Sequence, residues 1–153
     1  MVKIILFSDV HHATGYLKGM LRDNADADYY FFLGDGIENV MSLFPENMRD
    51  RLHAVEGNCD AMYQRDELVD VENKRFLLTH GNKYSVRAGL LGMQLRAEEV
   101  GANVACFGHT HSAVHVEDSG VHYINPGALT NGEYALVIVE NGEVFVVPQH
   151  AKK

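Results

Sequence analysis

The chain has 153 residues, of which 46% are hydrophobic and 22% are charged, and its formal net charge is -8. A chain of this length fits one domain over residues 1–153, which buries roughly 70% of the surface that its unfolded form exposes. The hydrophobic content excludes a disordered protein. An acidic chain without a visible cluster of Lys and Arg is also a poor partner for long nucleic acid, which requires many phosphate contacts.

Cysteine content and hydropathy indicate the compartment. Cys59 and Cys106 are too few for a disulfide framework, and the apolar N-terminal run stops at Asp9, too early for a secretion signal. No segment of the sequence approaches the ~20 apolar residues of a membrane span. We therefore expect a cytoplasmic protein that has no association with membranes.

The first half of the chain predicts alternating strands and helices. Short apolar runs at 3–7 and 29–33 indicate buried strands, and the segment between them has Leu17, Met20 and Leu21 on one helical face. A helix over 38–44 and a strand over 52–56 continue the pattern. Strand, helix and strand in this order predict parallel crossovers.

The second half predicts a hairpin over 68–78, a helix over 85–100 that Ser85 caps, and a strand over 103–107. Turn signals at 118–120 and 141–142 then predict antiparallel hairpins. We see no linker or repeat and place no domain boundary. An exposed hairpin edge in the last third leaves a homo-oligomer open.

Five of the predicted strands end in side chains that can bind metal ions, which are Asp9 with His11, Asp35, Asn58, His80, and His109 with His111. In open α/β sheets, ligands bind outside the carboxyl ends of the strands, so these side chains are expected to converge. Carboxylate, imidazole and amide groups suit two divalent ions, and Asp35 is the natural bridge. An extended Asp-x-His or His-x-His pair would place both side chains on one face. Turn formation explains single Asp and Asn residues here, but not the two histidines of 108–111 together with the rest.

In chain order these motifs read Asp-x-His, Gly-Asp, Gly-Asn-x-Asp, His-Gly and Gly-His-x-His, and together they resemble the calcineurin-like metallophosphoesterase superfamily. The short length and Asn125-Pro126-Gly127 are similar to its small bacterial and archaeal phosphodiesterase branch. The resemblance implies an α/β fold, a four-layer αββα sandwich of two mixed β-sheets, with the metal site at the carboxyl ends of the strands.

The resemblance also implies the ligand sets and the reaction. It places Asp9, His11, Asp35 and His111 on the first metal, and Asp35, Asn58, His80 and His109 on the second. The implied metal is Mn, with Fe, Zn, Ni and Co as alternatives, because mixed nitrogen and oxygen ligands do not select among these ions. A hydroxide held between the two metals would attack a small phosphate ester. The formal charge of such a centre, about +1, favours a phosphodiester.

Two residues bear on whether the chain is an enzyme. Cys59 stands where many phosphatases of the superfamily have a histidine that protonates the leaving group, so Cys59 is a candidate general acid. Our hypothesis is that this protonation is weak. The alternative function is a non-catalytic metal-binding scaffold, because the superfamily contains one in the retromer coat that lacks the histidine after the first aspartate. His11 is present here, which favours the enzyme.

Overall fold

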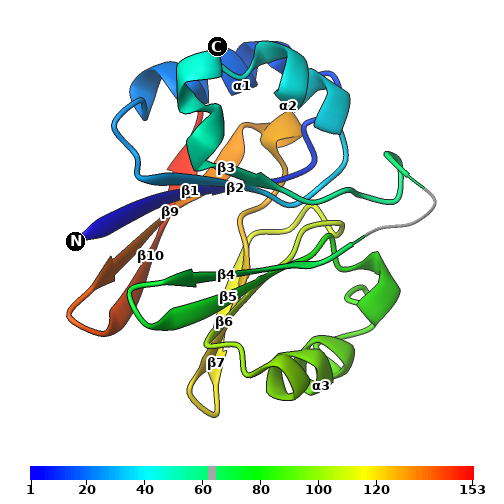
Figure 1. Ribbon diagram of the computed structural model, residues 1–153. Helices are drawn as coiled ribbons and strands as arrows, with labels where there is room; N and C mark the ends of the chain where they lie inside the picture. Colours follow the sequence, from blue (N-terminus) through cyan, green and yellow to red (C-terminus); the bar gives the residue numbers. More distant parts are fainter. Residues whose placement is uncertain (62–64) are drawn as a thin grey trace.

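The computed structural model describes residues 1–61 and 65–153 of the chain, and its architecture is two β-sheets packed face to face between helices (Figure 1). The first sheet has the order β10 (Glu143–His150), β9 (Glu133–Glu140), β1 (Val2–Phe7), β2 (Tyr29–Phe32) and β3 (Leu52–Ala54). The second has the order β4 (Glu67–Val71), β5 (Lys74–Leu78), β6 (Val104–Cys106), β8 (Val121–Asn125) and β7 (Val114–Asp118).

Helices cover the outer faces of the two sheets. The first sheet is covered by α1 (Thr14–Asp23), α2 (Ile37–Leu43) and the 3-10 helix η1 (Glu46–Arg51), and the second by α3 (Leu91–Val100). Two further 3-10 helices are η2 (Asn82–Tyr84) and η3 (Leu129–Asn131). The order of layers is helix, sheet, sheet, helix, which confirms the predicted αββα sandwich of mixed sheets.

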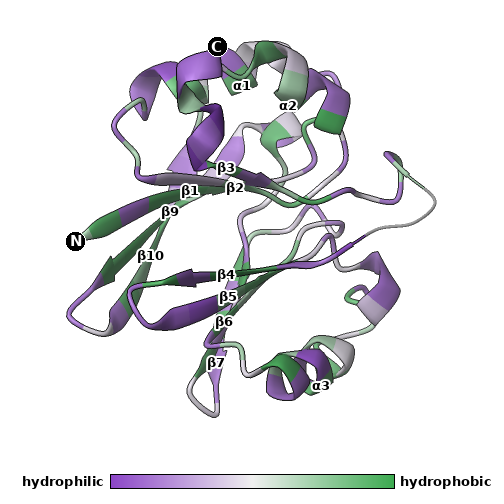
Figure 2. Ribbon diagram, in the orientation of Figure 1, coloured by the Kyte–Doolittle hydropathy of each residue, from purple (hydrophilic) through white to green (hydrophobic). Residues whose placement is uncertain are grey.

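Alternation along the strands builds the three layers of core. On β1, Ile4 and Leu6 point into the core between the sheets, whereas Ile5 and Phe7 pack under the helices. This is the period of two that a strand buried on both faces requires. Figure 2 shows the result as green hydrophobic stretches in the strands and frequent purple residues on the covering helices.

The pairing places the carboxyl ends of several strands at one edge of the sandwich. Strands β1, β2 and β3 are parallel, with Ile4 opposite Tyr29 and Tyr30 opposite Leu52. Strands β5 and β6 are also parallel, with Phe76 opposite Val104. The crossovers predicted for the first half are therefore confirmed, and each of these five strands delivers the chain that follows it to the same edge.

The predicted start of one helix was wrong. The helix does not start at Ser85: α3 begins at Leu91, and Ser85 ends η2 with a φ of 54°. Gly89 has a φ of 140°, outside the range of a right-handed helix, so the helix begins only after this residue. Both hairpins predicted in the last third are confirmed, because β7 pairs antiparallel with β8 and β9 with β10, although β8 also pairs parallel with β6. The described helices are too short or too polar to cross a bilayer.

Candidate metal centre

The residues that follow the parallel strands meet where the two sheets touch. Asp9 and His11 follow β1, Asp35 follows β2, His80 follows β5, and His111 follows β6. Side-chain atoms of these residues form two groups in which every potential ligand atom lies within 4.8 Å of the others in its group. The groups are Asp9, His11 and His111, and Asp9, Asp35 and His80.

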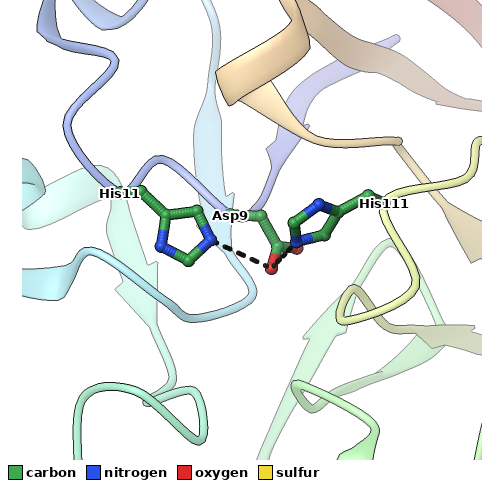
Figure 3. A group of neighbouring side chains, drawn as sticks. All are labelled: Asp9, His11 and His111. Atoms are coloured by element: carbon green, nitrogen blue, oxygen red, sulfur yellow. Dashed lines mark hydrogen bonds and ion pairs between the residues drawn. The ribbon is translucent and has the colours of Figure 1, made fainter.

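Asp9 lies at the centre of both groups. Its Oδ1 is 3.1 Å from His111 Nε2, 4.0 Å from His11 Nε2 and 3.9 Å from His80 Nε2. Figure 3 shows the two outer histidines turned toward this carboxylate from opposite sides. The carboxylate that belongs to both groups is Asp9, whereas the predicted bridge was Asp35.

Each carboxylate is held by one oxygen, which leaves the other oxygen free to bind. Asp9 Oδ2 accepts hydrogen bonds from Ser8 Oγ at 2.6 Å and from the backbone N–H of His109 at 3.1 Å. Asp35 Oδ1 accepts from the backbone N–H of Cys59 at 2.8 Å, and Asp35 Oδ2 lies 3.3 Å from His80 Nε2. Such outer contacts orient metal ligands in proteins.

His80 is fixed in the same way. Its Nδ1 donates to the carbonyl oxygen of Leu33 at 2.7 Å, so a neutral ring carries its lone pair on Nε2. That Nε2 is buried and has no hydrogen-bond partner, although it faces the carboxylates of Asp9 and Asp35. A lone pair enclosed with two carboxylates is the donor set that a divalent cation requires, so these residues fit a bound metal ion.

The charges within the centre couple His80 and Asp35. Burial raises the pKa of Asp35, but the close approach of His80 and the hydrogen bond from the backbone N–H of Cys59 outweigh burial and lower this pKa to about 2. Burial lowers the pKa of His80, but the close approach and charge of Asp35 outweigh burial, so the pKa is raised overall. The two groups thus hold each other in their charged forms, and a cation would replace the proton between them.

Asn58 and His109 extend the centre on the side of His80. Asn58 Oδ1 is 3.2 Å from His109 Nδ1, and the rings of His80 and His109 are 5.1 Å apart between centroids. Burial and the charges of His80 and Arg87 lower the pKa of His109, which favours the neutral ring that binds metal. All seven predicted ligands are therefore brought to one place.

The backbone that positions these ligands is not extended, which corrects the expected geometry of the Asp-x-His and His-x-His pairs. Five of the seven have a left-handed φ: 54° for Asp9, 48° for His11, 69° for Asp35, 70° for His109 and 62° for His111. This region is rare for residues other than glycine. Strained conformations of this kind cluster at functional sites, where the surrounding structure holds them.

Two residues that support the site were not among the predicted site residues. Ser8 orients Asp9, as described above. Asp60 accepts backbone N–H bonds from Asp35, Gly36 and Gly57 at 2.7, 2.8 and 2.9 Å, and from Ile37 at 3.2 Å. One carboxylate therefore ties the loop after β2 to the loop after β3. The signal for Asp60 was its place in the Gly-Asn-x-Asp motif, whereas an isolated serine gives none.

Cys59 lies beside the centre, in a hollow of about 280 Å³ that His11, His12 and Asp60 also line. Burial and the nearby charge of Asp35 raise the pKa of its thiol. Its backbone N–H has the defined role of holding Asp35. Asn125, the first residue of the Asn-Pro-Gly sequence, donates from Nδ2 to Gly108 O and Thr110 Oγ1 and so braces the loop that carries His109.

Comparison with known proteins shows the family of this chain. The model of the calcineurin-like phosphoesterase superfamily domain matches residues 2–142. The probable metallophosphoesterase YsnB of Bacillus subtilis is 30% identical over 95% of this chain and 89% of its own length. The phosphodiesterase YfcE of Escherichia coli K12 is 26% identical over 85% of this chain and 80% of its own.

The fold is shared with a predicted phosphoesterase of Streptococcus pneumoniae, whose crystal structure superposes with a TM-score of 0.80. That structure is 21% identical in sequence and covers 97% of this chain and 89% of its own. The match of the family model over nearly the whole chain, together with the 30% identity to YsnB, decides the family. This chain belongs to the calcineurin-like phosphoesterase superfamily, a family of metal-dependent phosphoesterases.

Proposed function

We propose that the chain is a phosphodiesterase that hydrolyses a small phosphate ester with two divalent cations. The metal that we propose is Mn²⁺. The observation that carries the proposal is the buried Nε2 of His80, which has no hydrogen-bond partner and faces two carboxylates. In this proposal His11 and His111 would hold one cation, and Asp9 and Asp35 would contribute to holding both. The ligands of the other cation are Asn58, His80 and His109.

The chain itself contributes orientation. Two divalent cations supply the chemistry by lowering the pKa of a water molecule and by offsetting the charge of the phosphate. Hydrogen bonds from Ser8 to Asp9 Oδ2, from His80 Nδ1 to Leu33, and from the N–H of Cys59 to Asp35 Oδ1 fix these side chains. The remaining oxygen or nitrogen of each side chain, which would bind metal, therefore need not reorganise when charge develops. Hydrolysis adds water across one P–O bond, so the alcohol or phenol leaves with a proton.

The charge and size of the site support a small diester. With Asp9, Asp35 and one hydroxide, two divalent cations leave a formal charge of about +1, which matches a phosphodiester monoanion. The hollow beside Cys59 has a volume of about 280 Å³, and a groove at Arg87 has a volume of about 370 Å³. Volumes of this size accommodate the substituents of a small molecule. The relative YfcE, which is named as a phosphodiesterase, agrees with this choice.

The test is hydrolysis of bis(4-nitrophenyl) phosphate by chelator-treated protein, with and without added Mn²⁺. We expect Mn²⁺ to restore turnover, and the Asp35→Asn variant to lose it. Asp70→Asn is the matched control, because Asp70 is an exposed carboxylate that pairs with Arg75 on β5. The monoester 4-nitrophenyl phosphate should be hydrolysed more slowly than the diester in the same assay.

The alternative is a metal-binding scaffold with the same fold. It predicts that the protein binds Mn²⁺ but shows no turnover of either ester with Mn, Fe, Zn, Ni or Co. The complete set of seven ligand side chains, His11 included, supports the enzyme instead, because a purely structural ion does not require a second, partly exposed half of the site.

A further inference from the structure

An apolar groove adjoins the metal centre on the side of His109. It has a volume of about 370 Å³, and its apolar lining consists of Val86, Leu90, Phe107, Val114 and Val116. Val114 and Val116 lie two residues apart on β7, so they present their side chains on the same face of that strand. Single exposed valines are ordinary on protein surfaces, but five apolar side chains around one hollow are characteristic of a ligand pocket.

The groove is continuous with the candidate metal centre. Arg87 lines the groove, and its Nε donates to His109 Nε2 at 3.1 Å. Thr110, which also lines the groove, lies in sequence between the ligands His109 and His111. A molecule that fills the groove and has an anionic end at Arg87 would therefore place that end beside the centre.

The two hollows beside the centre differ in chemistry. The second hollow is lined by His11, His12, Glu38, Asn39, Cys59 and Asp60, with Ile37 and Gly36. Polar groups dominate that lining, so an apolar group would have to remove them from water at a cost. The groove at Arg87 offers apolar contacts beside a guanidinium, which is suited to pairing with phosphate oxygens.

The contact between Arg87 and His109 also shows how Arg87 becomes available. His109 Nδ1 faces Asn58 Oδ1 and donates to it, which leaves the Nε2 lone pair for Arg87. A neutral imidazole that binds a cation through Nδ1 carries its proton on Nε2 and has no lone pair there. Arg87 then loses its acceptor, and its exposed side chain is free to pair with a phosphate.

We propose that this groove binds an apolar aryl or alkyl group of the phosphate ester, and that Arg87 pairs with the phosphate. The substrate class is then a diester that carries at least one apolar group. The inference rests on the proposed function, since the metal centre must hold the phosphate for the groove to select its substituent.

The experiment is calorimetric titration of the Mn²⁺-loaded protein with methylphosphonate and with phenylphosphonate, which measures binding without turnover. We expect phenylphosphonate to bind about tenfold more tightly, because the groove covers part of its ring. Val116→Ser should reduce that preference about threefold while leaving the affinity for methylphosphonate unchanged. Val147→Ser is the matched control: both valines lie on edge strands, and they are 39% and 40% exposed.

A variant of Arg87 tests whether this residue pairs with the phosphonate group. Arg87→Gln should weaken the binding of both phosphonates about tenfold, because it removes a charge-assisted hydrogen bond to the shared group. Equal affinity for the two phosphonates, or equal effects of Val116→Ser and Val147→Ser, would overturn the groove as the subsite while the proposed function stands. Absence of any phosphonate binding would overturn the proposed function, and with it this inference.

Discussion

His80 and Leu33 are joined by a hydrogen bond of 2.7 Å that connects the second sheet to the first. Leu33 follows β2 and His80 follows β5, so the contact closes the edge of the sandwich where the ligands meet. It also fixes which nitrogen of His80 faces Asp35. One bond between the sheets thus contributes both to the fold and to the orientation of a ligand.

Metal binding should stabilise the fold through this cluster. At a Mn²⁺ concentration of about 100 times its Kd, we expect the free energy of unfolding to rise by about 2.7 kcal/mol. Asp35→Asn keeps an oxygen for the N–H of Cys59 but removes the charge, so most of the rise should be lost. Urea unfolding of chelator-treated protein, with and without Mn²⁺, measures it. An equal rise in this variant would show that the ion binds elsewhere.

The hydroxyl of Ser8 should control metal affinity without touching the metal. Ser8→Ala removes the hydrogen bond of 2.6 Å that holds Asp9 Oδ2. We expect Mn²⁺ affinity to fall about 10–100-fold, the usual effect of losing an outer-shell partner. Titration of metal-free protein measures the change, with Ser42→Ala on the exposed side of α2 as the control. Unchanged affinity would mean that the backbone alone orients Asp9.

Asp60 should stabilise the loops on both sides of Asp35. Its carboxylate accepts four backbone N–H groups, and an amide in its place presents hydrogen atoms to some of them. We expect Asp60→Asn to lower the free energy of unfolding by about 2–3 kcal/mol. Mn²⁺ affinity should fall as well, because the loops carry Asp35 and Asn58. If Asp60→Asn lowers the stability but keeps full Mn²⁺ affinity, Asp60 does not position the metal ligands.

The positions of the ligands were predictable because each follows a short strand whose final residue is apolar. The run before Asp9 and the run before Asp35 are buried on both faces, so their carboxyl ends had to reach the sheet edge together. The convergence of side chains from the second sheet, such as His80, followed from the same pattern. Sequence periodicity therefore located the site without any knowledge of contacts.

The local backbone of the ligands was not predictable in this way. Aspartate and histidine rarely adopt a left-handed φ, and only tertiary contacts hold Asp9 and His111 there. Side chains also approach the backbone of two glycines closely: a Cβ on Gly57 would lie 2.1 Å from Asp35 Oδ1, and one on Gly108 would lie 2.0 Å from Ser8 Oγ. The sequence shows these glycines but not which atoms approach them.

Cys59 should contribute little as a general acid. Burial and the charge of Asp35 raise the pKa of its thiol, which makes it a weaker proton donor. We expect rates for a series of aryl phosphate esters to depend equally steeply on the pKa of the leaving phenol in the wild type and in Cys59→Ala. The backbone N–H that holds Asp35 remains in the variant. A dependence that becomes steeper only in Cys59→Ala would identify the thiol as a working acid.

Tyr84 should make the fold sensitive to alkaline pH. Burial and the hydrogen bond that its hydroxyl donates to Asp66 raise the pKa of Tyr84 to about 12, against the opposing charge of Arg96. The unfolded chain has a tyrosine pKa of about 10. The folded state therefore binds this proton more tightly, and the stability that follows is complete below pH ~10 and is lost as the pH rises through ~12.

The variant Tyr84→Phe removes the proton and leaves the ring, which lies beside Lys83. Between pH 9 and pH 11, the free energy of unfolding should therefore fall less in Tyr84→Phe than in the wild type. Tyr30 and Tyr123, whose pKa values burial also raises, are present in both proteins, so their effect cancels in the comparison. Urea unfolding at the two pH values gives the difference, and an identical fall in both proteins would show that Tyr84 ionises as readily when folded as when unfolded.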